Sequence, residues 1–136
     1  EVRRLGIRLL LDRHPGMVGE LGAHGWHADG TELARTVQRP EGIALCIASC
    51  HSREDLAAAA GLGFDAAVLG PLNATPTHPG VDPLGLSVFE QVMTGCNLPV
   101  YAIGGVGPQD IANVHLRGGQ GVAGIRAFWP HSAVAG

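Results

Sequence analysis

Six short apolar runs recur along the chain, separated by segments with helical patterning. The runs cover residues 7–12, 23–28, 43–49, 65–70, 98–105 and 121–127. Helical patterns occupy residues 52–63, 83–95 and 107–119. The runs have the length of β-strands, and several are continuously apolar, as strands covered on both faces are. Because strands that alternate with helices pair in parallel, the pattern predicts an α/β fold with six strands.

Capping residues mark the ends of the helical segments. The helix after the third run is expected to begin at Ser52 or Arg53 and to end at Gly61 or Gly63. The last helix is expected to carry Pro108 in its first turn, where a missing N–H is tolerated. These local signals support the same strand and helix order as the apolar runs.

Composition favours one compact domain over residues 1–136. The chain is 46% hydrophobic and carries 21 glycines, which suits many tight connections. Its net charge of −3 argues against nucleic acid or an anionic membrane as partner, since both select a clustered positive surface. No apolar run reaches the roughly 18 residues of a membrane span, and a cytoplasmic location is expected. The three cysteines, Cys46, Cys50 and Cys96, show no zinc or redox spacing and are expected in the core.

Polar residues and glycines follow the predicted strands. Asp12, Ser49, Gly70, Gly104 and Arg126 each stand where an apolar run gives way to a loop. The carboxyl ends of parallel strands share one edge, and ligands bind there in both barrels and open sheets. This edge is therefore the expected functional site.

Three residues of that edge are candidates for acid–base or metal chemistry. His51 is the best acid–base candidate because imidazole titrates near neutrality; a surface histidine beside a helix cap is the alternative. Asp12 and Glu32 could together hold Mg²⁺, although Glu32 also suits the start of a helix. The other histidines considered, His14, His24, His27, His115 and His131, show no ligand spacing.

Three loops are candidates for phosphate or ligand contacts. The stretch "VLGPLNATPTHPG" places Thr75, Thr77 and His78 in one proline-rich segment, which could instead be an ordinary solvated turn. "AIGGVGPQDIANV" and "GVAGIRAFW" place glycines between a strand and the following turn or helix, where backbone N–H groups can approach a phosphate. A tight turn that requires glycine for its backbone angles is the alternative for both.

The order of these motifs resembles a known family. "LLLDRH", "GWHADGTELA", "IASCHS", "VLGPLNATPTHPG", "YAIGGV" and "GVAGIRAFW" are similar, in this order, to the later strands of the thiamine phosphate synthase and TenI family. The resemblance covers residues 7–130. "THPG" with "GVAGIRAFW" further resembles the module fused behind a Nudix hydrolase domain in some bacteria.

The resemblance implies a (β/α)8 TIM barrel that joins an aminopyrimidine diphosphate to a thiazole phosphate and releases pyrophosphate with Mg²⁺ assistance. It places Ser49, Thr75, Thr77 and His78 at the substrate and pyrophosphate site. It places Gly104, Gly105, Ile125 and Arg126 at the thiazole phosphate. Asp12 and Glu32 match the magnesium carboxylates.

Four positions depart from the family pattern. Leu11 replaces an asparagine, Gly30 a glutamine, His78 a lysine and Arg126 a serine. A leaving pyrophosphate needs fixed positive charge, so the loss of the lysine weakens the case for synthase activity. The departures leave open a TenI-like tautomerase that uses His51, or a non-catalytic ligand-binding module attached to a Nudix hydrolase.

The six predicted strands are about six of the eight β/α units of such a barrel. The chain begins at Glu1 rather than methionine, so it is expected to be an N-terminally truncated part of a longer chain, with a covalently linked Nudix domain upstream as one arrangement. Open strand edges invite pairing with another chain, and a homodimer would cover them.

Overall fold

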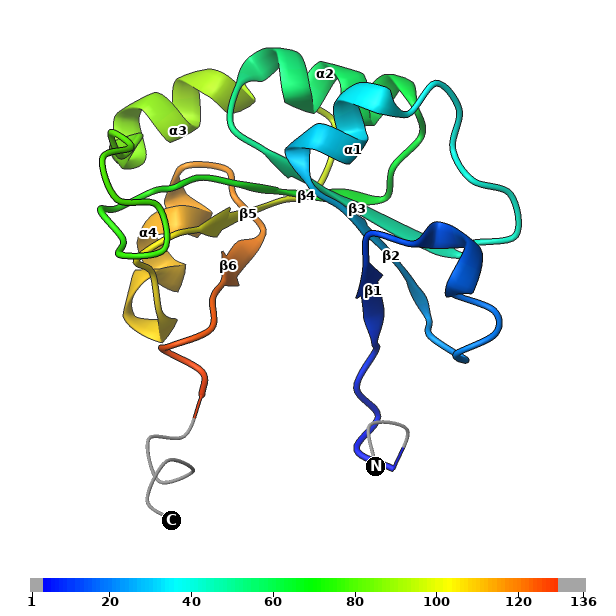
Figure 1. The fold of residues 1–136 in the computed structure, drawn as a ribbon. Helices are drawn as coiled ribbons and strands as arrows, with labels where there is room; N and C mark the ends of the chain where they lie inside the picture. The colour runs from blue at the N-terminus through cyan, green and yellow to red at the C-terminus, as the bar shows by residue number, and fades with distance from the viewer. Residues whose placement is uncertain (1–3, 130–136) are drawn as a thin grey trace. The chain divides into compact units, whose positions relative to one another are not determined.

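The computed structural model describes residues 4–129 and shows a sheet with helices packed on its strands (Figure 1). The strands follow the order β1-β2-β3-β4-β5-β6 in one six-stranded sheet. The strand pairs β1–β2, β2–β3 and β5–β6 are parallel. This confirms the predicted α/β class and a strand at each of the six apolar runs.

The chain forms two compact units. Unit 1 comprises Glu1–Val68 and Gly95–Pro99, and unit 2 comprises Leu69–Thr94 and Val100–Gly136. The strand β4 (Ala66–Leu69) runs from the first into the second. The prediction of a single domain over residues 1–136 stays a prediction.

Unit 1 is built from three parallel strands and two helices. Its elements are β1 (Leu10–Asp12), the 3-10 helix η1 (Pro15–Met17), β2 (Gly25–Ala28), α1 (Gly30–Arg35), β3 (Leu45–Cys50) and α2 (Arg53–Gly61). The helices α1 and α2 pack on each other and on β3 (Figure 1). The side chains of β3 alternate, with Cys46, Ala48 and Cys50 buried. The expected core position of Cys46 and Cys50 is confirmed, whereas Cys96 is only partly buried, so its expected core position is wrong.

Side-chain caps begin both helices of unit 1. Asp29 accepts a hydrogen bond from the Glu32 N–H at 2.8 Å, and Ser52 accepts one from the Asp55 N–H at 3.1 Å. Such caps satisfy N–H groups that have no partner within the first helical turn. The expected start of α2 at Arg53, after Ser52, is confirmed.

Unit 2 contains the remaining strands and helices. They are α3 (Gly85–Met93), β5 (Val100–Ile103), the 3-10 helix η2 (Pro108–Asp110), α4 (Ile111–Leu116) and β6 (Gly121–Ala123). Phe89 and Val114 are fully buried. A Cβ at Gly119 would lie 2.4 Å from Val114 and 3.2 Å from Phe89, so glycine permits this close packing.

The strands are shorter than the apolar runs that predict them. The last run of unit 2 extends to residue 127, but β6 ends at Ala123 and the chain then turns. Likewise β5 ends at Ile103, because Gly104 and Gly105 have φ values of +95° and +62°, outside the extended region.

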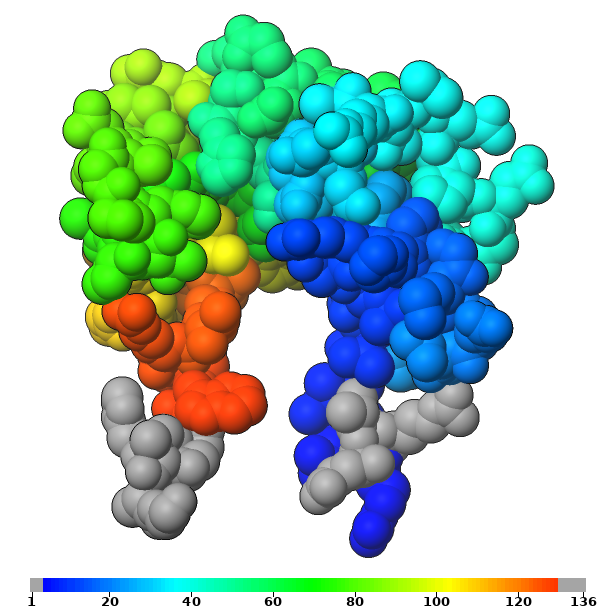
Figure 2. Space-filling view, viewed as in Figure 1, coloured from blue at the N-terminus to red at the C-terminus, as the bar shows by residue number. Residues whose placement is uncertain are grey.

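Apolar side chains precede β1 on the surface of unit 1. Leu5, Ile7 and Leu9 are 66%, 53% and 41% exposed. Figure 2 shows this segment, dark blue, at the surface of the face in view. The segment has no strand structure of its own and leads directly into β1, the first strand of the sheet.

Candidate functional site

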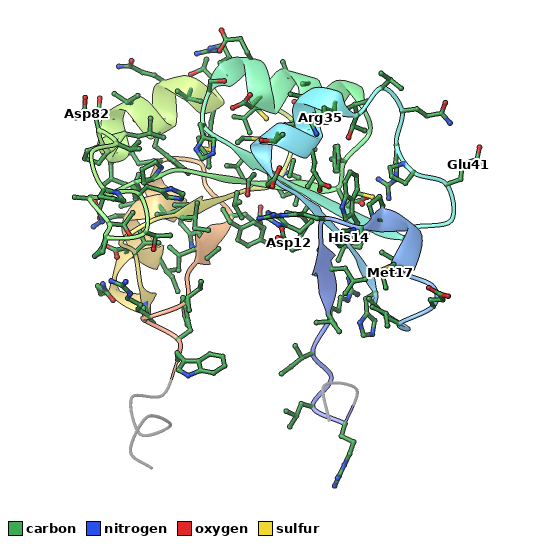
Figure 3. All side chains as sticks on the ribbon, in the orientation of Figure 1. Asp12, His14, Met17, Arg35, Glu41 and Asp82 are labelled. Carbon is green, nitrogen blue, oxygen red and sulfur yellow. The ribbon has the colours of Figure 1, made fainter. Side chains whose placement is uncertain are left out.

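A chain of hydrogen bonds links three strands of unit 1 at their carboxyl ends. His27 Nδ1 lies 2.9 Å from Asp12 Oδ1, and His27 Nε2 lies 2.8 Å from Ser49 Oγ. Asp12 ends β1, at the end remote from the N-terminal segment (Figure 3). Three polar side chains from β1, β2 and β3 therefore form one connected group, which we call the Asp12–His27–Ser49 chain.

Strand register explains why these three residues meet. Asp12 pairs with His27, and His27 pairs with Ile47. Ser49 lies two residues beyond Ile47 and so points to the same face of the sheet. The burial pattern agrees, because His27, Ile47 and Ser49 are all partly exposed while their strand neighbours are buried. The Asp12–His27–Ser49 chain thus lies on the face of these strands opposite to α1 and α2.

Arg13 places a cation beside this chain. Its Nε lies 3.3 Å from Asp12 Oδ2 and 3.5 Å from Asp29 Oδ2. Arg13 and His14 have φ values of +58° and +51°, which L residues adopt rarely and which recur at functional sites. The turn after β1 is therefore a strained turn that points a guanidinium between two carboxylates.

The two predicted magnesium carboxylates differ in their surroundings. Oε2 of Glu32 is buried and has no hydrogen-bond partner, which fits an oxygen ligand that lacks its cation. Asp12 shares Oδ2 with Arg13 in an exposed ion pair, a weak contact that a divalent cation can replace. Across residues 4–129 no group of three or more His, Cys, Asp or Glu residues could hold a metal ion. The assignment of Asp12 and Glu32 to magnesium stays a prediction, which the unpartnered oxygen of Glu32 supports.

His51 follows Ser49 on the loop after β3. Its backbone N–H donates to Asp55 Oδ2 at 2.8 Å, which ties it to the first turn of α2. Its ring lies beside Gly30, where a Cβ would be 3.8 Å from Cδ2 of His51. The exposed ring therefore stands over the start of α1, in the same unit as the Asp12–His27–Ser49 chain.

The predicted pyrophosphate contacts of unit 2 form a compact turn. The Thr77 N–H donates to Thr75 Oγ1 at 3.3 Å, and the His78 N–H donates to the Thr75 carbonyl at 3.2 Å. Such hydroxyl-to-backbone bonds are typical of turns in Thr- and Pro-rich segments. Thr77 and His78 are exposed, so their side chains can reach a ligand, and the turn alone also accounts for these residues.

The two glycines after β5 lie against the loop that leads into this turn. Asn73 N–H donates to the Gly104 carbonyl at 3.0 Å, and Asn73 Nδ2 donates to the Gly105 carbonyl at 3.0 Å. A Cβ at Gly104 would lie 2.6 Å from Pro71, and one at Gly105 would lie 2.8 Å from the carbonyl of Ala74. Glycine is required here for both backbone angle and space.

Ile125 and Arg126 lie in the turn after β6. Both are exposed, and the Phe128 N–H donates to the Ile125 carbonyl at 3.2 Å. Within residues 4–129 no carboxylate pairs with Arg126. Arg126 therefore exposes a guanidinium at the turn that the resemblance assigns to the thiazole phosphate, and that assignment stays a prediction.

The cysteines of β3 are unsuited to nucleophilic chemistry. Burial, with smaller contributions from Asp55 and Cys96, raises the pKa of Cys50 to about 12. Burial also raises the pKa of Cys46. Since the thiolate is the reactive form, both thiols stay protonated and inert near neutral pH.

Sequence reasoning missed His27, Arg13 and Asp29. His27 was grouped with the histidines that lack ligand spacing, because its partners lie 15 and 22 positions away in the chain. Its place at the end of a predicted strand, level with Asp12, was the available signal. The residue types at Arg13 and His14 do not predict the left-handed turn that the backbone forms there.

The sequence matches a known protein family over nearly its whole length. The family model described as thiamine monophosphate synthase (TMP-TENI) matches residues 1–128. The chain is 38% identical over 80 residues to a putative thiamine-phosphate synthase 2 of Aquifex aeolicus, covering 59% of this chain and 43% of that protein. It is 34% identical over 124 residues to a thiamine-phosphate synthase of Pelotomaculum thermopropionicum, covering 89% of this chain and 57% of that protein.

Another relative is a much longer protein than this chain. A thiamine biosynthesis bifunctional protein, ThiM/ThiE, of Symbiobacterium thermophilum is 34% identical over 130 residues, which cover 92% of this chain and 27% of that protein. The chain thus spans less than two thirds of the length of each of these three relatives.

Solved structures share the fold. A thiamine phosphate pyrophosphorylase from Pyrococcus furiosus superposes with a TM-score of 0.71 at 19% identity, covering 91% of this chain and 59% of that one. The six-stranded parallel sheet and this similarity confirm the predicted TIM-barrel type of α/β fold. With the family model matched over residues 1–128, the chain belongs to the thiamine monophosphate synthase (TMP-TENI) family.

Proposed function

We propose that the chain is part of a protein of thiamine biosynthesis that joins an aminopyrimidine diphosphate to a thiazole phosphate and releases pyrophosphate. The observation that carries this proposal is the family match over residues 1–128. Three relatives carry names that refer to thiamine phosphate synthesis or thiamine biosynthesis. Because fold alone does not determine function, the proposal depends on the residues of each unit.

In unit 1 the proposal assigns metal and substrate binding to the carboxyl ends of β1, β2 and β3. Asp12 and Glu32 would hold Mg²⁺, which takes one or two carboxylates and completes its shell with water and phosphate oxygens. The unpartnered oxygen of Glu32 supports this role. When bound, the ion would supply positive charge as the pyrophosphate leaves. Ser49, held by His27, would bind the organic part of the substrate.

In unit 2 the proposal assigns phosphate contacts to three loops. Thr75, Thr77 and His78 would contact pyrophosphate, because Thr77 and His78 are exposed at the surface of this turn. The loop at Gly104 and Gly105 and the turn at Ile125 and Arg126 would hold the thiazole phosphate. Arg126 supports this role because a guanidinium matches a phosphate in charge and geometry.

Calorimetric titration tests the proposal directly. The protein is titrated with thiazole phosphate, with and without Mg²⁺ and pyrophosphate, and the released pyrophosphate is assayed in the presence of both substrates. Thr75→Ala and Arg126→Gln should each weaken binding about tenfold, which corresponds to one lost charge-assisted or polar contact. Thr94→Ala is the matched control, because Thr94 is an exposed threonine at the C-terminal end of α3, outside the proposed site. Absence of binding heat under every condition would contradict the proposal.

A thiazole tautomerase that uses His51 is the second candidate. The observation that favours it is the space beside His51, since Gly30 presents no side chain to the exposed imidazole ring. A tautomerase needs one group to remove and return a proton, which an imidazole does well near neutral pH. Turnover of the thiazole tautomer without pyrophosphate release, abolished in His51→Ala, would favour this function over synthesis. Unchanged tautomer turnover in His51→Ala would eliminate it.

Several expectations about the whole protein stay predictions. They are the homodimer, the upstream Nudix domain and the cytoplasmic location. For residues 4–129, none of the helices combines the length and apolar character needed to cross a bilayer. Sedimentation of the full-length protein would test the dimer.

A further inference from the structure

Asn73, in the loop that follows β4, makes two hydrogen bonds to the glycine loop that follows β5 (residues 104–107). Its backbone N–H donates to the Gly104 carbonyl, and its Nδ2 donates to the Gly105 carbonyl, both at 3.0 Å. A Cβ at Gly105 would lie 3.0 Å from Cβ of Asn73, so the two loops are in close contact. Asn73 therefore holds two successive carbonyl groups of the glycine loop.

These two hydrogen bonds determine the direction of two backbone N–H groups. A trans peptide group is planar, so its N–H points in the direction opposite to its carbonyl. The Gly104 carbonyl shares a trans peptide group with the N–H of Gly105, and the Gly105 carbonyl shares one with the N–H of Val106. Because Asn73 holds both carbonyls, both N–H groups point away from Asn73.

The two N–H groups are available to a ligand. Among the residues that the structure describes, 4–129, neither the Gly105 N–H nor the Val106 N–H donates to a protein acceptor. Val106 is only 5% exposed, and buried backbone N–H groups without a partner are rare in folded proteins. Successive N–H groups beside residues of positive φ, here Gly104 and Gly105, form a concavity that suits an anion.

The turn after β6 lies on the other side of the glycine loop. In the sheet, β5 stands between β4 and β6. A Cβ at Gly124 would lie 3.3 Å from the carbonyl oxygen of Val106, so this turn contacts the glycine loop directly. The glycine loop therefore lies between Asn73 and the turn that carries the exposed Arg126.

We propose that Asn73 is a positioning residue for phosphate binding in unit 2. It holds two carbonyls of the glycine loop away from the anion, so that the N–H groups of Gly105 and Val106 face a phosphate monoester. This inference rests on the proposed function for the identity of the monoester, a thiazole phosphate. Because glycine restricts backbone rotation little, loss of the Asn73 amide lets the peptide group after Gly105 turn its carbonyl toward the phosphate, which repels it.

Asn73→Ala tests the proposal, because it removes the side-chain amide and leaves the backbone N–H. The full-length protein is titrated by calorimetry with inorganic phosphate and with thiazole phosphate. The loss of one hydrogen bond should weaken the binding of both about fivefold. Asn97→Ala is the matched control, since Asn97 is an exposed asparagine in the loop before β5, at the opposite end of that strand, and it should bind both as the wild type does. Equal affinities of the two variants would overturn the proposal.

Amide chemical shifts distinguish positioning from a purely structural role. In the wild type, inorganic phosphate should shift the amide protons of Gly105 and Val106, and at saturating phosphate these changes should be smaller in Asn73→Ala. A lower unfolding temperature of Asn73→Ala with unchanged phosphate shifts would show a purely structural role and overturn the proposal. Because the wild-type titration needs no variant, the absence of shifts at both amides would overturn it even if Asn73→Ala does not fold.

The two ligands separate this inference from the proposed function. If the wild type binds thiazole phosphate no more tightly than inorganic phosphate, the proposed function loses its support, while the effect of Asn73→Ala on inorganic phosphate still decides the role of Asn73. If thiazole phosphate binds tightly and Asn73→Ala leaves its affinity unchanged, the proposed function stands and this inference fails.

Discussion

Asp65 Oδ2 lies 2.9 Å from Nη2 of Arg39, and it also accepts the backbone N–H of Cys46 at 2.8 Å. The same guanidinium donates to the carbonyls of Ile43 and Gly63. One arginine thus ties together the segments that lead into β3 and β4 within unit 1. Since these contacts lie at the amino ends of the strands, they stabilise the unit rather than form its ligand site.

Asp65→Asn should destabilise unit 1 by about 1 kcal/mol at pH 7, because the ion pair and a charge-assisted hydrogen bond are lost while partial exposure weakens both. Urea unfolding monitored by tryptophan fluorescence measures the change, since Trp26 packs against Phe64 in this unit. Asp82→Asn is the control, because Asp82 is an exposed carboxylate with no partner among residues 4–129. Equal midpoints for the two variants would contradict the assignment.

The same contact predicts how stability depends on pH. Partial burial alone would raise the pKa of Asp65, but the hydrogen bonds from Cys46 and Arg39 outweigh burial and lower it. The unfolded state therefore takes up a proton at higher pH than the folded state does. The stabilisation is fully present above about pH 4, the usual value for Asp, and is lost as pH falls through the lower folded pKa. The difference between the wild type and Asp65→Asn should shrink over that acidic window; a constant difference would refute the pKa shift.

Local signals in the sequence were sufficient for the order of elements and for the start of α2. An apolar run or a serine cap is defined by a few neighbouring residues, so it can be recognised without knowledge of the fold. The ends of β5 and β6 were misplaced because apolar residues continue past the point where the backbone turns, as at Gly104. The local pattern depends only on side-chain type. The backbone angle φ of a loop glycine such as Gly104 also depends on neighbours distant in the sequence, such as Pro71.

The candidate site could be predicted only where its residues are marked by local sequence signals. Asp12 and Ser49 lie at strand ends and within motifs that resemble the family, so their place at the carboxyl edge of the sheet could be inferred. The role of His27 depends on register across three strands, which no single segment encodes. Arg13 was missed because its position follows from two left-handed residues in succession, a choice that residue types alone do not indicate.

The serine cap of α2 offers a second stability prediction. Ser52→Ala should destabilise the protein by about 1 kcal/mol, because the Asp55 N–H loses the partner that it has at 3.1 Å. Ser52→Asn should restore most of that loss. Thermal unfolding followed by circular dichroism measures both, with Ser87→Ala as control for the same change at an exposed position inside α3. A loss in Ser87→Ala as large as in Ser52→Ala would show that the cap is unimportant.

Substitution of two glycines of unit 2 distinguishes the cost of a left-handed backbone from the cost of a steric clash. Gly80 has a φ of +78° with open space at its Cβ position, whereas Gly104 has a φ of +95° and would place a Cβ 2.6 Å from Pro71. Gly80→Ala should therefore lose only about 1–2 kcal/mol from the left-handed conformation. Gly104→Ala should lose about 1–3 kcal/mol more from the clash. Denaturant midpoints compare the two variants, and equal values would mean that the loop at Gly104 moves away freely.

The reactivity of the cysteines tests whether the buried face of β3, opposite to the face that carries Ser49, is closed to solvent. With a pKa of about 12, Cys50 is about one part in 10⁴ thiolate at pH 8, and it is only 1% exposed. Cys96 is partly exposed. Iodoacetamide should therefore modify Cys96 first in the folded protein, and Cys46 and Cys50 only after unfolding in urea, as peptide mass spectrometry would show. Native modification of Cys50 as fast as that of Cys96 would mean that α2 opens readily from β3, and the register that joins His27 to Ser49 would then be too mobile to hold the hydroxyl in place.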